Sequence, residues 1–95
     1  MTEEQRLYLG DRAKEVLENE AFSGAMEQIE KDIIEQWTTS PARDAAGRES
    51  LWTYLCLLRK LKANLQTTLE TGKLARIELE HKRTMRERLR DALSD

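Results

Sequence analysis

The stretch Thr38-Thr39-Ser40-Pro41 contains the only proline of the 95-residue chain. The residue before a proline is disfavoured in the α-helical region, so a helix that arrives from the N-terminal side must end here. Ser40 is a good N-cap, and Pro41 suits the first position of a helix. The stretch therefore predicts a hinge at residues 38–40, followed by a helix that begins at Pro41.

The segment before this hinge has the pattern of one long helix, at about residues 3–37. Thr2 and Gln5 form a capping-box pattern at its start. Apolar residues then recur at steps of three and four, which is typical of a helix with one buried stripe. They are Leu9, Ala13, Val16, Leu17, Ala21, Phe22, Ala25, Met26, Ile29, Ile33 and Trp37. Gly10 and the Ser23-Gly24 pair weaken the helix locally, and a bend at Ser23-Gly24 is an open alternative.

The segment after the hinge predicts a second, longer helix over about residues 41–93. Its apolar stripe consists of Leu51, Tyr54, Leu55, Leu58, Leu61, Leu65, Leu69 and Gly72. A bend at Gly72 also stays open. Asp44 and Arg48 carry opposite charges four residues apart, which favours an ion pair on a helix. Because a short hinge makes two helices antiparallel, residues whose numbers sum to about 79 are expected to face each other. The first helix then covers the second as far as about residue 76, and residues 77–95 overhang as a basic tail.

These patterns predict an all-α fold for a single domain at residues 1–95. The fold is an antiparallel helical hairpin with a longer second helix. A chain this small, without a disulfide or a metal, is marginally stable alone, and its apolar stripes are wider than one contact needs. We therefore expect a homo-oligomeric helical bundle of the coiled-coil type. The residues expected in the core or the oligomer contact are Phe22, Met26, Ile29, Ile33, Trp37, Leu51, Trp52, Leu55, Leu58 and Leu65.

The near-neutral net charge hides an asymmetry between the two halves of the chain. Residues 1–40 carry four basic and ten acidic side chains, whereas residues 41–95 carry twelve basic and eight acidic ones. The candidate phosphate contacts lie in the tail and are Lys82, Arg83, Arg86 and Arg90. A solvated helix face is the alternative interpretation, because acidic residues such as Glu87 and Asp91 are interleaved with them.

The sequence offers little for catalysis. Cys56 and His81 are the only cysteine and histidine, and they lie about 37 Å apart along a continuous helix. Cys56 sits in an apolar stretch, which predicts a buried thiol. No metal-ligand cluster, nucleotide-binding loop, secretory signal or membrane-spanning segment is recognisable. We expect a protein of the cell interior that is not an enzyme and has no cofactor, no small-molecule substrate and no membrane partner.

A scattered set of residues between positions 20 and 76 carries a resemblance to a known group of proteins. The residues are Ala21-Phe22, Ala25, Trp37, Thr39, Pro41, Asp44, Arg48-Glu49, Leu51-Trp52, Leu55, Leu58, Leu65, Gly72-Lys73 and Ala75. This set resembles short helical proteins of tailed bacteriophages that are encoded among DNA-packaging and head-assembly genes. The resemblance implies a small-terminase-like or related assembly component, in the cytoplasm of the infected host cell or associated with the virion.

Three functions remain open at the level of sequence. The first is a non-enzymatic, self-associating helical protein of phage virion assembly or DNA packaging. The second is a nucleic-acid-binding module that uses the basic C-terminal helix on DNA. The third is a regulatory adaptor that docks another phage or host protein through the tail. The oligomer number and geometry also stay open.

Overall fold

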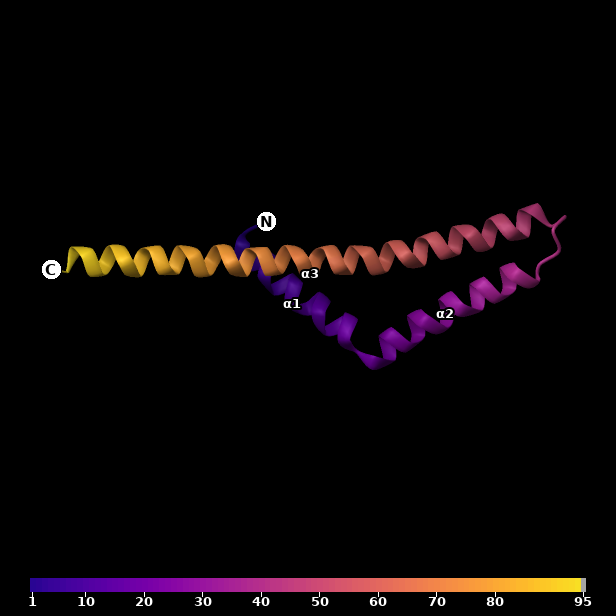
Figure 1. Cartoon of the computed structure of the whole chain (residues 1–95), viewed down its shortest axis with the longest axis horizontal. Helices are drawn as coiled ribbons and strands as arrows, with labels where there is room; N and C mark the ends of the chain where they lie inside the picture. The colour runs from indigo at the N-terminus through magenta and orange to yellow at the C-terminus, as the bar shows by residue number, and fades with distance from the viewer. Residues whose placement is uncertain (95) are drawn as a thin grey trace.

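The computed structural model describes residues 1–94, and every regular element in that range is an α-helix. The helices are α1 (Glu3–Glu18), α2 (Glu20–Thr39) and α3 (Ala45–Leu93). The prediction of an all-α fold is therefore confirmed. The molecule measures 80 × 24 × 16 Å, and α3 runs along its long axis while α1 and α2 lie on one side of it (Figure 1).

The helix expected over residues 3–37 is in fact two helices, because the chain breaks at Asn19. Asn19 is extended (φ −70°, ψ 121°), and its backbone N–H donates to the carbonyl of Val16, closing the end of α1. Its side-chain oxygen accepts from the backbone N–H of Phe22 and caps the start of α2. Asparagine favours such cap positions over helix interiors. The bend visible in Figure 1 thus falls at Asn19, and Gly24 lies inside α2.

The connection between α2 and α3 is longer than the predicted hinge, and α3 begins at Ala45 rather than at Pro41. Ser40 closes α2, with its hydroxyl donating to the carbonyl of Trp37 at 2.6 Å. Asp44 is the N-cap of α3 and accepts from the backbone N–H of Gly47 at 3.1 Å. Aspartate and serine are similarly favourable N-cap residues, and in the structure Asp44, not Ser40, caps the start of α3.

Arg48 fastens this connection instead of forming the predicted ion pair with Asp44. Its guanidinium donates to the hydroxyl of Ser40 at 3.1 Å and lies 4.0 Å from the ring centre of Trp37. A guanidinium over an indole face is a favourable cation–π contact. Arg48 therefore ties the first turn of α3 to the last turn of α2.

Along its inner side α3 has the residue spacing of a coiled coil. Leu51, Leu58, Leu65, Gly72 and Leu79 are seven residues apart, and each is buried or half-buried. Leu55, Leu69 and Ala75 fall between them. The residues with the same spacing on the shorter helices are Arg6, Gly10, Ala13 and Leu17 in α1, and Met26, Glu30 and Ile33 in α2. A repeat of 3.5 residues places such residues on one side of each helix, and we call this inner row of residues the seam.

The closest approach within the seam lies between Gly10 of α1 and Gly72 of α3. A Cβ atom built on either glycine would stand 2.7 Å from the Cα of the other. Ala13 and Ala75 are buried one turn further along their helices. Small residues let the two backbones meet here. Gly72 causes no bend, since α3 continues without interruption through it.

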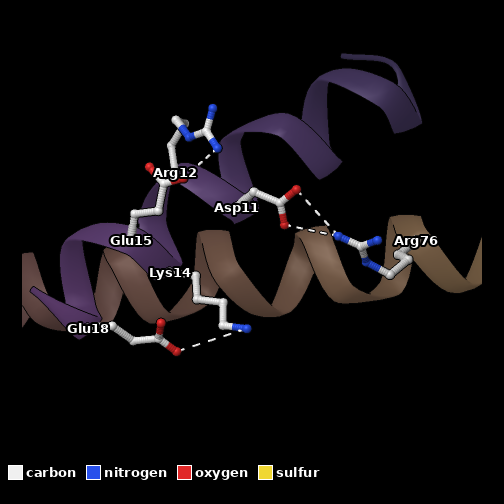
Figure 2. A network of polar contacts seen from close by, with 6 residues as sticks. All are labelled: Asp11, Arg12, Lys14, Glu15, Glu18 and Arg76. Atoms are coloured by element: carbon white, nitrogen blue, oxygen red, sulfur yellow. Dashed lines mark hydrogen bonds and ion pairs between the residues drawn. The ribbon is translucent and has the colours of Figure 1, made fainter.

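Three ion pairs between helices show the register in which α1 and α2 lie along α3. Lys82 lies 2.6 Å from Glu3, Arg76 lies 3.2 Å from Asp11, and Arg59 lies 2.9 Å from Glu30. Figure 2 shows the Asp11–Arg76 pair reaching from α1 across to α3. The paired residue numbers sum to 85–89 rather than about 79, since the longer connection shifts α3 along its neighbours.

The same shift shortens the overhang of the second helix. Helix α1 contacts α3 as far as Lys82, whereas the sequence predicted contact only to about residue 76. Residues 83–94 are the part that extends beyond this last contact, and we call them the C-terminal arm. Asp95, the end of the predicted tail, lies outside the described residues.

Candidate interaction surface

The chain exposes far more surface than a compact protein of its mass. Its accessible area is 7666 Å², whereas a compact monomer of 11.1 kDa exposes about 5,700 Å². Within residues 1–94 the buried apolar side chains are Ala13, Leu55 and Ala75 alone. Most of the large apolar side chains therefore face solvent wholly or in part.

A row of exposed, largely apolar residues follows the length of α3 and is distinct from the seam. Its members are Trp52, Cys56, Ala63, Leu74, Ile77, His81, Met85 and Leu89. Their separations of 3, 4, 7 and 11 residues place them on one side of an α-helix. Trp52 is 58% exposed, and Ile77 and Leu89 are each 61% exposed. We call this row the outer face of α3.

The position of Cys56 on this face corrects the expectation that its thiol is buried. Cys56 is exposed. The seam uses Leu55 and Leu58, and successive residues of a helix point about 100° apart, so the residue after Leu55 turns away from the seam. A local apolar sequence predicted burial, but the chain has too few partners to cover every side of α3.

An apolar groove lies between α2 and α3 beside the connection. It has a volume of about 180 Å³ and is lined by Ile33, Ile34, Trp37, Leu51, Trp52 and Leu55. Its wall on α3 includes Trp52, the first residue of the outer face. Its wall on α2 includes Trp37, which is 43% exposed. The groove thus adjoins the start of the outer face, whose apolar residues are interrupted by exposed charged ones such as Lys60 and Glu70.

The structure divides the ten predicted core residues among four environments. Ile33, Trp37, Leu51, Trp52 and Leu55 line the apolar groove. Phe22, Met26 and Leu58 line a second pocket, whose rim carries Glu27, Glu30, Arg59 and Lys62. Leu65 is half-buried at the seam, and Ile29 is exposed on α2. Trp37 and Trp52 lie near the connection, and both remain open to solvent.

The four residues that were predicted to contact phosphate differ in the ion pairs that they form. Lys82 is engaged by Glu3, and this hydrogen bond holds the pKa of the Glu3 carboxyl below its ordinary value. Arg83 lies 3.9 Å from Glu87. Arg86 and Arg90 make no ion pair with any described residue, and they flank a shallow apolar hollow on the C-terminal arm. The arm therefore offers two unpaired guanidinium groups beside exposed apolar side chains.

Helix α2 carries the complementary charge. It contains five acidic residues and one basic residue, and only Glu30 among the acidic ones is paired with a cation, Arg59, within residues 1–94. Asp32 accepts from the Gln28 amide at 2.8 Å but has no cationic partner there. Among these carboxylates, Asp32 and Glu35 are adjacent in sequence to the residues that line the apolar groove, whereas Glu27 and Glu30 lie at the second pocket.

Comparisons with family models, curated proteins and solved structures found no match to this chain. None of the described helices is long and apolar enough to cross a membrane. In the part of the chain that the structure describes, no group of three histidine, cysteine or acidic side chains is arranged to hold a metal ion.

Proposed function

We propose that this chain is a non-enzymatic helical protein that associates with itself, as an antiparallel hairpin unit of a larger bundle, and serves phage virion assembly or DNA packaging. The observation that supports self-association is the outer face of α3. It places large apolar side chains in water along one side of a helix that spans the molecule. Exposed apolar side chains gathered on one side of a helix favour a contact with another protein surface.

The free energy available from this face is large relative to the stability of so small a chain. Burying one Leu, Ile or Met side chain contributes about 1.5–3 kcal/mol. A typical interface buries about 800 Å² on each partner. The chain exposes about 2,000 Å² more than a compact monomer of its mass, as expected of a rod with few buried side chains.

The phage role rests on the resemblance of residues 20–76 to short head-assembly and packaging proteins. A rod-like helical unit with unpartnered apolar surface is consistent with a building block that functions in an assembly. The genes beside the coding sequence test this part. Portal, head or terminase genes are expected there, and a locus without any virion gene would contradict it.

Light scattering of the purified full chain tests self-association. The expected mass is at least twice the chain mass of 11.1 kDa. Trp52→Glu, which puts a charge on the outer face, should lower the mass. Ser50→Glu is the matched control, because it adds the same charge to an exposed position that points away from that face. A folded wild-type monomer would overturn the proposal.

Binding of DNA is a second candidate function, and the unpaired Arg86 and Arg90 favour it. Each copy would use these guanidinium groups to contact phosphates of the DNA backbone. Retention on DNA should then fall steeply as salt rises, and it should be lost in Arg86→Glu/Arg90→Glu. No retention of the wild-type chain at low salt would exclude this candidate.

A further inference from the structure

We infer that two copies of the chain pair antiparallel along the outer face of α3, so that the C-terminal arm of each lies in the apolar groove of the other. The inference rests on the proposed self-association and adds which surfaces meet. Three features of the structure carry it: the extent of the outer face, the chemistry of the groove and the distribution of charge.

The outer face extends from Trp52, beside the connection, to Leu89 in the C-terminal arm. Leu69 is the midpoint of α3. If the two copies are related by a two-fold axis that passes α3 at Leu69, the C-terminal arm of one copy lies beside the first two turns of α3 in the other copy. The same surface then serves both partners, as a two-fold dimer requires. Parallel pairing would leave both grooves without an occupant.

The groove favours an apolar side chain as its occupant, because every residue that lines the groove is apolar. Its volume of about 180 Å³ exceeds the roughly 150 Å³ of a cavity that binds benzene, so it can hold a Leu or a Met side chain. The arm carries Met85, Leu89 and Leu93, all exposed. Of the exposed apolar segments of α3, the arm is the one that the antiparallel arrangement brings to the groove.

The distribution of charge favours the same antiparallel arrangement. The arm has four arginines against two acidic residues, and the part of α2 that lines the groove carries Asp32 and Glu35 against Lys31. Arm-to-arm pairing would bring Arg86 and Arg90 against their own copies, and pairing of the two connection ends would bring two acidic α2 helices together. Both alternatives place like charges opposite each other, which is unfavourable.

A disulfide between cysteines at positions 34 and 85 tests this arrangement. Ile34 lines the groove with Leu55, and Met85 lies thirty residues beyond Leu55 on α3, about 45 Å away at 1.5 Å per residue. A disulfide needs Cα atoms within about 7 Å, so these two positions cannot join within one chain. The variant is the full chain with Ile34→Cys and Met85→Cys, and with Cys56→Ser to remove the native thiol.

Under mild oxidation this variant should form covalent dimers as its main product on non-reducing gels. The two single-site variants in the Cys56→Ser background are the matched controls and should stay uncrosslinked. Efficient dimers of the Met85→Cys control would show arm-to-arm pairing, and those of the Ile34→Cys control would show pairing of the connection ends. Either result would overturn the inference.

The proposed function fails separately from the inference. If light scattering shows an oligomer but the double-cysteine variant does not crosslink, the arm does not occupy the groove and the inference is wrong. If the full chain is a folded monomer by light scattering, self-association itself is wrong.

Discussion

Gly10 and Gly72 lie so close that a Cβ atom on Gly10 would stand only 2.7 Å from the Cα atom of Gly72. Helices α1 and α3 therefore touch backbone to backbone at this point. This contact fixes the point at which α1 meets the long helix. It also sets the register in which Asp11 faces Arg76 and Glu3 faces Lys82. The position of α1 therefore depends on two residues that have no side chain.

Gly72→Ala should destabilise the fold even though alanine is the better helix former. The added Cβ meets the Gly10 backbone, which has no flexible end that can move aside, and overpacking of this kind costs about 1–3 kcal/mol. Urea unfolding followed by circular dichroism measures the change. Gly24→Ala is the matched control, because its Cβ would meet nothing within 4 Å, and it should stabilise by about 0.5–1 kcal/mol. Equal effects at the two positions would contradict the close contact.

Arg48→Ala should loosen the connection between α2 and α3. It removes the hydrogen bond to Ser40 and the contact with the Trp37 ring, with an expected loss of about 1–2 kcal/mol. Thermal unfolding and the fluorescence of Trp37 in a Trp52→Phe background report the effect. Arg43→Ala alters an exposed arginine of the same connection and serves as the control. If Arg48→Lys retained full stability, a planar guanidinium would not be needed there.

The Glu3–Lys82 pair should make stability depend on pH in the acid range. The hydrogen bond from Lys82 lowers the pKa of Glu3 in the folded state from its ordinary value of 4.5. A carboxyl with a lowered pKa stabilises the fold above that ordinary value, and the contribution is lost as pH falls through the lowered pKa. The difference in unfolding free energy between wild type and Lys82→Met should thus be present at neutral pH and vanish in acid. A difference that persists in acid would mean that Lys82 acts through packing.

Cys56 should report assembly, since it lies exposed on the outer face. Its thiol should react rapidly with Ellman's reagent in dilute protein and more slowly as the concentration and the associated fraction rise. In the antiparallel pair the two Cys56 residues lie about 39 Å apart, thirteen residues on either side of Leu69, so oxidation should not join them. A reactivity that stays constant while the mass rises would place the contact elsewhere.

The helical content and the position of the main turn follow from local chemistry, which is why the sequence predicted them. The capping box at Thr2 forms with Gln5 in both directions, at 3.1 Å and 2.9 Å. The only proline marks the connection. The exact start of α3 was not predictable from the same rules, because Ser40 and Asp44 are both good caps and tertiary contacts decide between them.

The break at Asn19 and the contact of Gly10 with Gly72 were missed for different reasons. The apolar spacing of three and four residues continues across Asn19, so it predicted a single uninterrupted helix in this region. Gly10 was interpreted as a local weakness of the helix, although the Gly-x-x-Ala pattern recurs as Gly10/Ala13 and Gly72/Ala75. That repeated pattern was the available signal, and its meaning depends on a register that only the fold supplies.

Sedimentation equilibrium of the full chain over the micromolar range measures whether the protein associates with itself. We expect a reversible association to twice the chain mass of 11.1 kDa, weakened by Trp52→Glu and unchanged by Ser50→Glu. A single folded species of 11.1 kDa at every concentration would contradict it, because the outer face of α3 would then remain in water without a partner.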